Sequence, residues 1–218
     1  MKNLEGRVFS IAAENRPVPG CTVSQLAGEK NGYYILHFSL AKGTGISPES
    51  YRYAKLWLAL EGGMKAVVSG RAKAPVKAGD LYVTPVGVPV GVQADENCVY
   101  TEITLKEGSN MNRILKDGAV FALKDLLPVQ EGKIVNMDLV NDEKLKFVVM
   151  SFGAGTALPE HAAPGEALIF ALDGEAVIGY AGTEHVIRAG ENFKFAKNGA
   201  HYVKAEKPFK MALVLTLD

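Results

Sequence analysis

Cysteine is scarce in the 218-residue sequence, which contains Cys21 and Cys98 and no other thiol. Small disulfide-stabilised domains need several cysteine pairs, and thiolate zinc sites need clustered Cys and His residues at short spacing. Neither cysteine lies in such a cluster. A disulfide framework and a cysteine-based zinc site are therefore excluded, and both thiols are expected to be buried or incidental.

An excess of charge of either sign is also missing, since Lys plus Arg and Asp plus Glu are 24 each. Proteins that bind nucleic acid neutralise phosphates with clustered basic residues, so the sequence argues against a nucleic-acid partner. No uncharged apolar run is long enough for a membrane span or a signal peptide. We therefore expect a soluble, cytoplasmic protein with no membrane partner.

The motifs of several common enzyme classes are absent. The sequence has no Gly-x-Ser-x-Gly nucleophile turn, no Walker loop and no dinucleotide-binding glycine motif at a strand-to-helix turn. It does have 23 Gly and 10 Pro residues spread along the chain, and 48% of its residues are hydrophobic. These features indicate a turn-rich globular protein that buries a core.

The chain repeats itself at an offset of 112 residues, the separation of Gly6 and Gly118. One deleted residue reduces the offset to 111 from Ala78 onward, where the partner is Ala189. Other matched pairs, in unbroken order, are Val8/Val120, Phe9/Phe121, Ser39/Ser151, Gly43/Gly155, Gly62/Gly174, Gly79/Gly190 and Ala94/Ala205. A repeat of domain length indicates one structural unit used twice, so we expect domains over residues 1–110 and 111–218.

Each half has the pattern of short strands separated by turns. Apolar runs at 33–40, 55–60, 147–152 and 167–172 are bounded by Gly, Pro or Asp. Helical patterns are confined to segments too short to form independent helices. The sequence therefore predicts an all-β fold.

Two short motifs in the C-terminal half indicate a family. In the first, Gly155 is followed by His161, Glu166 and the turn 172–175; in the second, Gly190 is followed by His201. This arrangement resembles the two motifs of the cupin family, in which three histidines and a glutamate usually hold a divalent metal. The stretch 159–174 is similar to a group of small two-cupin proteins with a reduced first motif.

The resemblance covers essentially the whole chain and implies two tandem double-stranded β-helix (jelly-roll, cupin) barrels. In such a barrel, alternate side chains of neighbouring strands converge inside the mouth. The resemblance therefore implies that His161, Glu166 and His201 form a ligand-binding and metal-binding set in the C-terminal barrel. If both histidines share one ligand, their ring nitrogens should lie about 3 to 5 Å apart.

Several departures from the family pattern affect this site. Ala163 replaces the second histidine, Ala196 replaces a proline, Asn198 replaces a glycine, and Glu166 is one residue too far from Gly174. A one-residue shift turns a strand side chain to the other face, so Glu166 reaches the metal position only if a bulge absorbs the extra residue. The sequence leaves open whether one divalent metal (Fe, Mn, Ni or Zn) binds or whether the site works without a metal.

The N-terminal half keeps the turn residues of the second motif, at Gly79, Pro85, Gly87 and Pro89, but not the ligands. The repeat places Glu49 opposite His161 and Val90 opposite His201, so we expect no metal there.

Aromatic residues in the N-terminal half suggest a different use. Tyr51, Tyr53 and Trp57 could line a pocket for an organic ligand, although aromatics in strands are more often core or interface residues. His37 and His185 lie outside both motifs and are expected to be strand or surface residues.

Three functions are compatible with these residues. The first is a small-molecule-binding barrel that contacts a small organic molecule through His161 and His201. The second is a metal-dependent oxygenase, isomerase or lyase with Glu166 as ligand or base. The third is a structural dimer without a working site. The sequence leaves enzyme activity undecided.

Because small cupins usually pair through sheet faces or edge strands, the resemblance also implies a homodimer.

Overall fold

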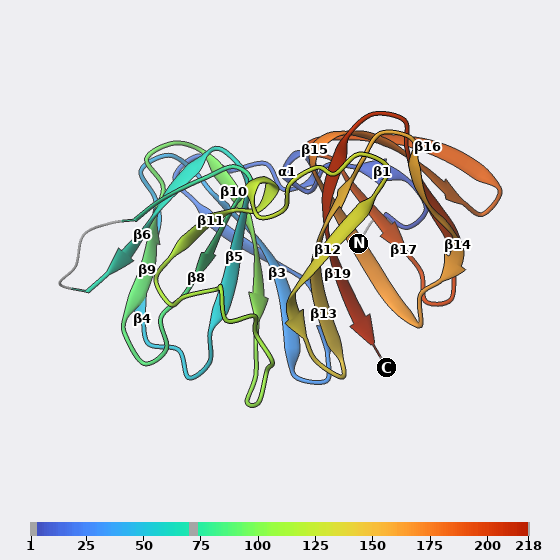
Figure 1. Ribbon diagram of the computed structural model, residues 1–218. Coiled ribbons are helices and arrows are strands. Elements are labelled where there is room, and N and C mark those ends of the chain that lie inside the picture. Colours follow the sequence, from blue (N-terminus) through green and yellow to red (C-terminus); the bar gives the residue numbers. More distant parts are fainter. Residues whose placement is uncertain (1–3, 70–73, 218) are drawn as a thin grey trace. The chain divides into compact units, whose positions relative to one another are not determined.

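Antiparallel β-sheet makes up nearly all of the regular structure, which confirms the predicted all-β, jelly-roll fold class. The computed structural model describes residues 4–69 and 74–217. These residues form two units: in Figure 1 one contains the yellow-to-red strands with the short dark blue strand at residues 8–9, and the other contains the remaining blue-to-green strands. We call residues 11–109 with 113–122 the N-terminal unit, and the remaining described residues the C-terminal unit.

The N-terminal unit contains two antiparallel sheets. The larger has the order β11-β8-β5-β10-β3-β2 and the smaller the order β4-β9-β6-β7. The strands of the larger sheet are β2 (Thr22–Lys30), β3 (Tyr33–Leu40), β5 (Lys55–Glu61), β8 (Asp80–Val83), β10 (Cys98–Thr104) and β11 (Val120–Ala122). Those of the smaller are β4 (Gly45–Glu49), β6 (Gly63–Val68), β7 (Ala74–Lys77) and β9 (Val90–Gln93), and one short helix, α1 (Ile11–Glu14), precedes β2.

The C-terminal unit repeats this plan as one continuous sheet system, because its strand β15 (Gly165–Tyr180) runs through both layers. The path β1-β17-β15-β19-β13-β12 forms one layer, and β14, β18 and β16 join through the end of β15. The bounds are β1 (Val8–Phe9), β12 (Ile134–Asn141), β13 (Leu145–Phe152), β14 (Thr156–Ala162), β16 (Thr183–Arg188), β17 (Asn192–Phe195), β18 (Ala200–Ala205) and β19 (Phe209–Leu217), with a 3-10 turn η1 (Leu123–Asp125).

The strand pairings of the two units agree with the sequence repeat. Leu40 pairs with Cys98 in the N-terminal unit, and the equivalent Phe152 pairs with Phe209 in the C-terminal unit. Both long central strands also carry an irregularity at the same place, after Ala59 in β5 and after Ala171 in β15. Register is set by which face of a strand is buried, so the agreement shows that both halves use the same pattern of inward residues.

The first strand of each repeat pairs with the unit formed mainly by the other half of the sequence. Val8 of β1 pairs with Phe193 of β17, and the equivalent Val120 of β11 pairs with Tyr82 of β8. Relative to the expected halves 1–110 and 111–218, the units have therefore exchanged these two strands. The offset identifies equivalent strands, but it does not say which sheet each one joins.

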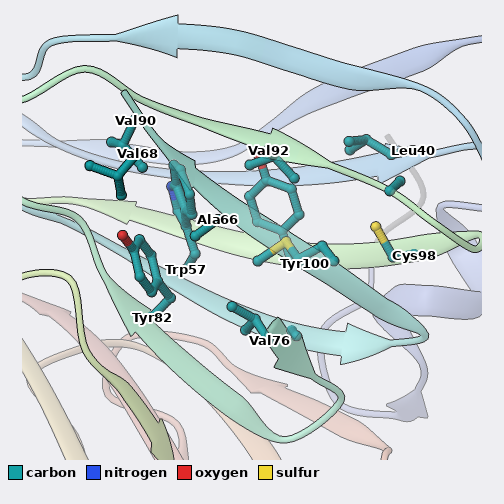
Figure 2. Close-up of a cluster of buried hydrophobic side chains, with 13 residues drawn as sticks. Leu40, Trp57, Ala66, Val68, Val76, Tyr82, Val90, Val92, Cys98 and Tyr100 are labelled. Atoms are coloured by element: carbon teal, nitrogen blue, oxygen red, sulfur yellow. The ribbon is translucent and has the colours of Figure 1, made fainter. Parts of the chain in front are cut away.

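Each unit encloses its own apolar core between its two layers. In the N-terminal unit the largest buried side chains are Trp57, Tyr82 and Tyr100 (Figure 2). The C-terminal core is built mainly from aliphatic residues and phenylalanines, including Phe193 and Phe195. Burial of such side chains is the main favourable term in folding. The apolar residues at the inward positions of the repeat therefore hold the two layers of each unit together.

Candidate functional site

His161 and His201 lie directly opposite each other in the C-terminal unit. They are cross-strand partners on β14 and β18, and their ring centroids are 4.4 Å apart. Opposed residues of antiparallel strands project from the same face, so both rings serve one site. The equivalent pair in the N-terminal unit is Glu49 and Val90, as the repeat predicts.

Backbone carbonyls fix the orientation of both rings. Nδ1 of His161 donates to the carbonyl oxygen of Pro159 at 2.9 Å, and Nδ1 of His201 donates to that of Gly199 at 2.8 Å. A neutral imidazole with its proton on Nδ1 keeps the lone pair on Nε2. Each ring therefore offers Nε2 as an acceptor or a metal ligand.

The two histidines differ in their surroundings. His201 is 5% exposed and stacks on Phe195, with ring centroids 3.9 Å apart and ring planes inclined by 20°. Burial lowers the pKa of His201; the hydrogen bond to Gly199 opposes this shift, and the neighbouring His161 adds to it. His161 is exposed, so His201 forms the inner side of the site and His161 its outer side.

The turn that leads into β18 keeps its shape despite a change in residue type. Asn198 replaces the glycine of the family motif and has a φ of 61°, close to the 70° of the equivalent Gly87. Asparagine tolerates this left-handed conformation better than most residues. The backbone N–H of Asn198 donates to the carbonyl of Ala163, and that of Gly87 donates to the equivalent Tyr51. The substitution is therefore compatible with the position of His201.

Glu166 is not brought to the histidine pair. On β15 it is exposed, and its Oε2 lies 2.8 Å from Nζ of Lys194. The next residue, Ala167, is 2% exposed and belongs to the core. Because strand side chains alternate, Glu166 points away from that core. The register shift in β15 comes after Ala171, beyond Glu166, and β5 has the same shift at the equivalent place. It therefore does not turn the Glu166 side chain toward the histidine pair.

The residues present do not fit an ordinary cupin metal centre. Within residues 4–69 and 74–217, no group of three His, Cys, Asp or Glu side chains is placed to hold a metal ion. Catalytic zinc and related sites usually take three ligands from the protein. The pair alone supplies two, and Ala163 and Ala167 occupy the positions from which further ligands would come.

Two aromatic residues next to His201, Phe195 and Tyr180, were not identified from the sequence. Tyr180 is the cross-strand partner of His201, and its ring centroid lies 5.5 Å from that of Phe195. His185, expected to be a strand or surface residue, lies on β16 with its ring 5.2 Å from Phe193. The alternation of apolar and polar residues in β17 was the available signal for Phe193 and Phe195.

The aromatic residues of the N-terminal half have different environments. Trp57 is buried, whereas Tyr51 and Tyr53 are partly exposed. The hydroxyl of Tyr53 donates to Oε2 of Glu107 at 3.3 Å. Nε1 of Trp57 donates to Oε2 of Glu102 at 2.8 Å, and the ring centroid of Tyr51 lies 4.1 Å from Nζ of Lys55.

Comparisons with known proteins agree with this architecture. A family model described as a cupin domain matches residues 148–216. The cupin 2 conserved barrel domain protein from Leptotrichia buccalis is 28% identical, covers 99% of both chains and superposes with a TM-score of 0.86. The fold is therefore the jelly-roll cupin fold, and the similarity to the cupin domain model lies in the C-terminal half.

More distant structures share the fold alone. A mutant of salicylate 1,2-dioxygenase from Pseudoaminobacter salicylatoxidans is 13% identical with a TM-score of 0.62, and the match covers 84% of this chain and 70% of that one. Oxalate decarboxylase from Bacillus subtilis is 13% identical with a TM-score of 0.54, and the match covers 100% of this chain and 78% of that one.

The comparison with curated proteins gave no match. Among the described residues, no helix has the length and apolar character required to cross a membrane.

Proposed function

We propose that this protein is a small-molecule-binding cupin whose ligand contacts His161 and His201 in the C-terminal unit. One observation carries the proposal. Two imidazoles face each other across β14 and β18, and each has its Nδ1 proton engaged by a backbone carbonyl. The two remaining Nε2 atoms are acceptors that one ligand can reach together.

The surroundings of the pair suggest the class of ligand. A neutral Nε2 atom accepts a hydrogen bond, so the complementary ligand presents two neighbouring O–H or N–H donors. The Phe195 ring beneath His201 and the nearby Tyr180 favour a flat apolar body next to those donors. A small aromatic or unsaturated diol has both features.

A metal-held ligand is the alternative, because Nε2 is also the atom with which histidine binds divalent metals. The chain supplies two such atoms here, one fewer than the usual catalytic site. We therefore propose direct contact between the ligand and the imidazoles. Metal analysis of the purified protein tests this point: one tightly bound metal per chain, lost in His161→Ala, would refute direct contact.

The binding experiment uses catechol as the probe and its dimethyl ether as the matched compound without donors. Isothermal titration calorimetry should show saturable binding of catechol and at least about tenfold weaker binding of the ether, because two hydrogen bonds are lost. His161→Ala should weaken catechol by about tenfold with little change in stability, since His161 is exposed. His185→Ala, in the same unit but outside the pair, is the control and should bind normally.

Equal binding of catechol by the parent protein and His161→Ala would overturn the proposal. So would equal affinity for catechol and its ether, because the imidazoles would then contribute no hydrogen bonds. His161→Ala is preferred to a change at His201, which is buried against Phe195 and contributes to packing.

A further inference from the structure

The interior of the N-terminal unit contains a charged pair where the C-terminal unit is apolar. Glu102 lies opposite Trp57 in the pairing of β10 with β5. The equivalent pair in the C-terminal unit is Leu213 and Ile169. Lys55 likewise corresponds to Ala167. The same inward positions therefore hold polar residues in one unit and aliphatic residues in the other.

The carboxylate of Glu102 is fully engaged by three donors. Its Oε1 lies 2.7 Å from Nζ of Lys55 and accepts from the Thr104 hydroxyl at 3.3 Å. Its Oε2 accepts from Nε1 of Trp57 at 2.8 Å. Glu102 is 3% exposed. Burying an ion pair costs desolvation free energy, and apolar residues of similar size at the same positions would not have this cost.

The repeat shows that the fold does not require this pair. Ala167 and Leu213 fill the equivalent positions of the C-terminal unit, and the strands there have the same register. Leu213 packs against the apolar core of that unit. Strand pairing alone therefore does not account for the charged residues of the N-terminal unit.

Two hydrogen-bond donors lie beside Trp57, the partner of Glu102, one on β5 and one on the neighbouring β8. Among the described residues, the Lys55 ammonium has Glu102 as its hydrogen-bonding partner and lies 4.1 Å from the ring centroid of Tyr51. The Tyr82 hydroxyl is buried without any hydrogen-bond partner, and Tyr82 is 0% exposed. Its ring stacks on Trp57 at 5.4 Å, and Figure 2 shows the hydroxyl on the side of Val68 and Val90.

Charge at this site excludes one class of ligand. Glu102 neutralises Lys55. Burial, together with the carboxylates of Glu102 and Glu49, raises the pKa of Tyr51 to about 12. Tyr51 therefore keeps its proton and can donate. An added anion would meet the buried Glu102 carboxylate as well as the Lys55 ammonium, whereas an uncharged acceptor would meet unused N–H and O–H donors.

We propose that the N-terminal unit has a second binding site, for a small uncharged organic molecule with a carbonyl acceptor and a flat apolar body. Lys55 and Tyr82 donate to the carbonyl, and Trp57 packs against the body of the ligand. Glu102 is a positioning residue that fixes the Lys55 ammonium and the indole of Trp57. This site is separate from the histidine pair and does not depend on the function proposed for it.

The sequence provides a local reporter, because Trp57 is its single tryptophan. Titration with acetophenone should change the Trp57 fluorescence saturably. N-acetyltryptophanamide, titrated in parallel, corrects for collisional quenching. Ethylbenzene lacks the acceptor and benzoate carries a charge, so both should bind at least about tenfold more weakly.

Two variants test the donors. Tyr82→Phe should weaken acetophenone by about fivefold, and Lys55→Met by about tenfold, in line with the loss of a neutral and a charged donor. Because Lys55→Met leaves the Glu102 carboxylate buried without its partner, Lys55→Met with Glu102→Gln is measured alongside. His161→Ala is the control and should bind acetophenone like the parent protein.

Three results would overturn the proposal. Quenching that matches free N-acetyltryptophanamide would show that no site exists. If ethylbenzene and acetophenone bound equally, and Tyr82→Phe changed neither affinity, the ligands would be filling a gap in the apolar core without any hydrogen bond to the carbonyl. Tighter binding of benzoate than of acetophenone would refute the assignment of an uncharged ligand.

Discussion

Removing the Tyr82 hydroxyl should stabilise the folded protein. The oxygen is buried and has no hydrogen-bond partner, whereas in the unfolded chain it is hydrated. Burying an unpaired hydroxyl costs about 1 to 3 kcal/mol. Tyr82→Phe keeps the ring against Trp57 and removes only that cost. We expect the free energy of unfolding to rise by about 1 kcal/mol, since relaxation of the surroundings recovers part of the penalty in the parent protein.

The matched control is the same substitution at Tyr180. Its hydroxyl donates to Glu5 at 3.1 Å and accepts from the backbone N–H of Ala196 at 3.4 Å. Tyr180→Phe should therefore lower the free energy of unfolding by about 1 kcal/mol. Urea titrations followed by far-UV circular dichroism measure both variants, with the m value checked for constancy. A loss of stability in Tyr82→Phe equal to that in Tyr180→Phe would refute the reasoning, because the Tyr82 hydroxyl would then be hydrogen-bonded.

Two further predictions concern pH and the turn before β18. Burial lowers the pKa of His37 to about 4 and also lowers that of His201, so the folded state binds fewer protons than the unfolded state below the ordinary value of 6.5. The free energy of unfolding should hold its full value above pH 6.5 and fall as the pH approaches 4, with His37 alone contributing up to about 3 kcal/mol of the fall. Urea titrations of His37→Gln should show a shallower fall. A fall equal to that of the parent protein would contradict the assignment. Asn198→Gly should change stability by less than about 0.5 kcal/mol, whereas Asn198→Val should cost more than about 1 kcal/mol because a β-branched residue is strained at a φ of 61°; equal thermal unfolding of the two variants would contradict this.

The sequence was sufficient to predict the fold class and the histidine pair. The offset of 112 residues aligned equivalent turns, and the family motifs placed His161 and His201 on strands that turn out to be adjacent. Whether Glu166 faces the histidine pair depends on which side chains of β15 point inward. A shift of one residue along the strand reverses the direction of every side chain. Glu166 could face inward only if a bulge absorbed the extra residue, and the structure shows that Ala167 takes the inward position.

Other features depended on contacts that no local pattern reveals. The offset marked β1 and β11 as equivalent strands, but the sheet that each joins depends on the path of the connecting segments. Glu102 lies in a strand with no motif, and a lone acidic residue in a strand is usually solvated. Its burial follows from the cross-strand neighbours Trp57 and Lys55, which are distant in sequence. A charged residue flanked by the apolar positions of β10 was the one available signal.

The two units show that the same strand pairing accommodates different side chains at the inner positions. Backbone pairing and inward alternation are the same in both, so the strands themselves do not require any particular polar residue at the inner positions. The C-terminal unit has imidazoles on β14 and β18 and aliphatic residues on β15 and β19, whereas the N-terminal unit has Val90 on β9 and the ion pair on β5 and β10. The two proposed ligands accordingly differ in hydrogen-bonding character: the imidazole acceptors of His161 and His201 suit a ligand with donors, whereas Lys55 and Tyr82 suit a ligand with an acceptor.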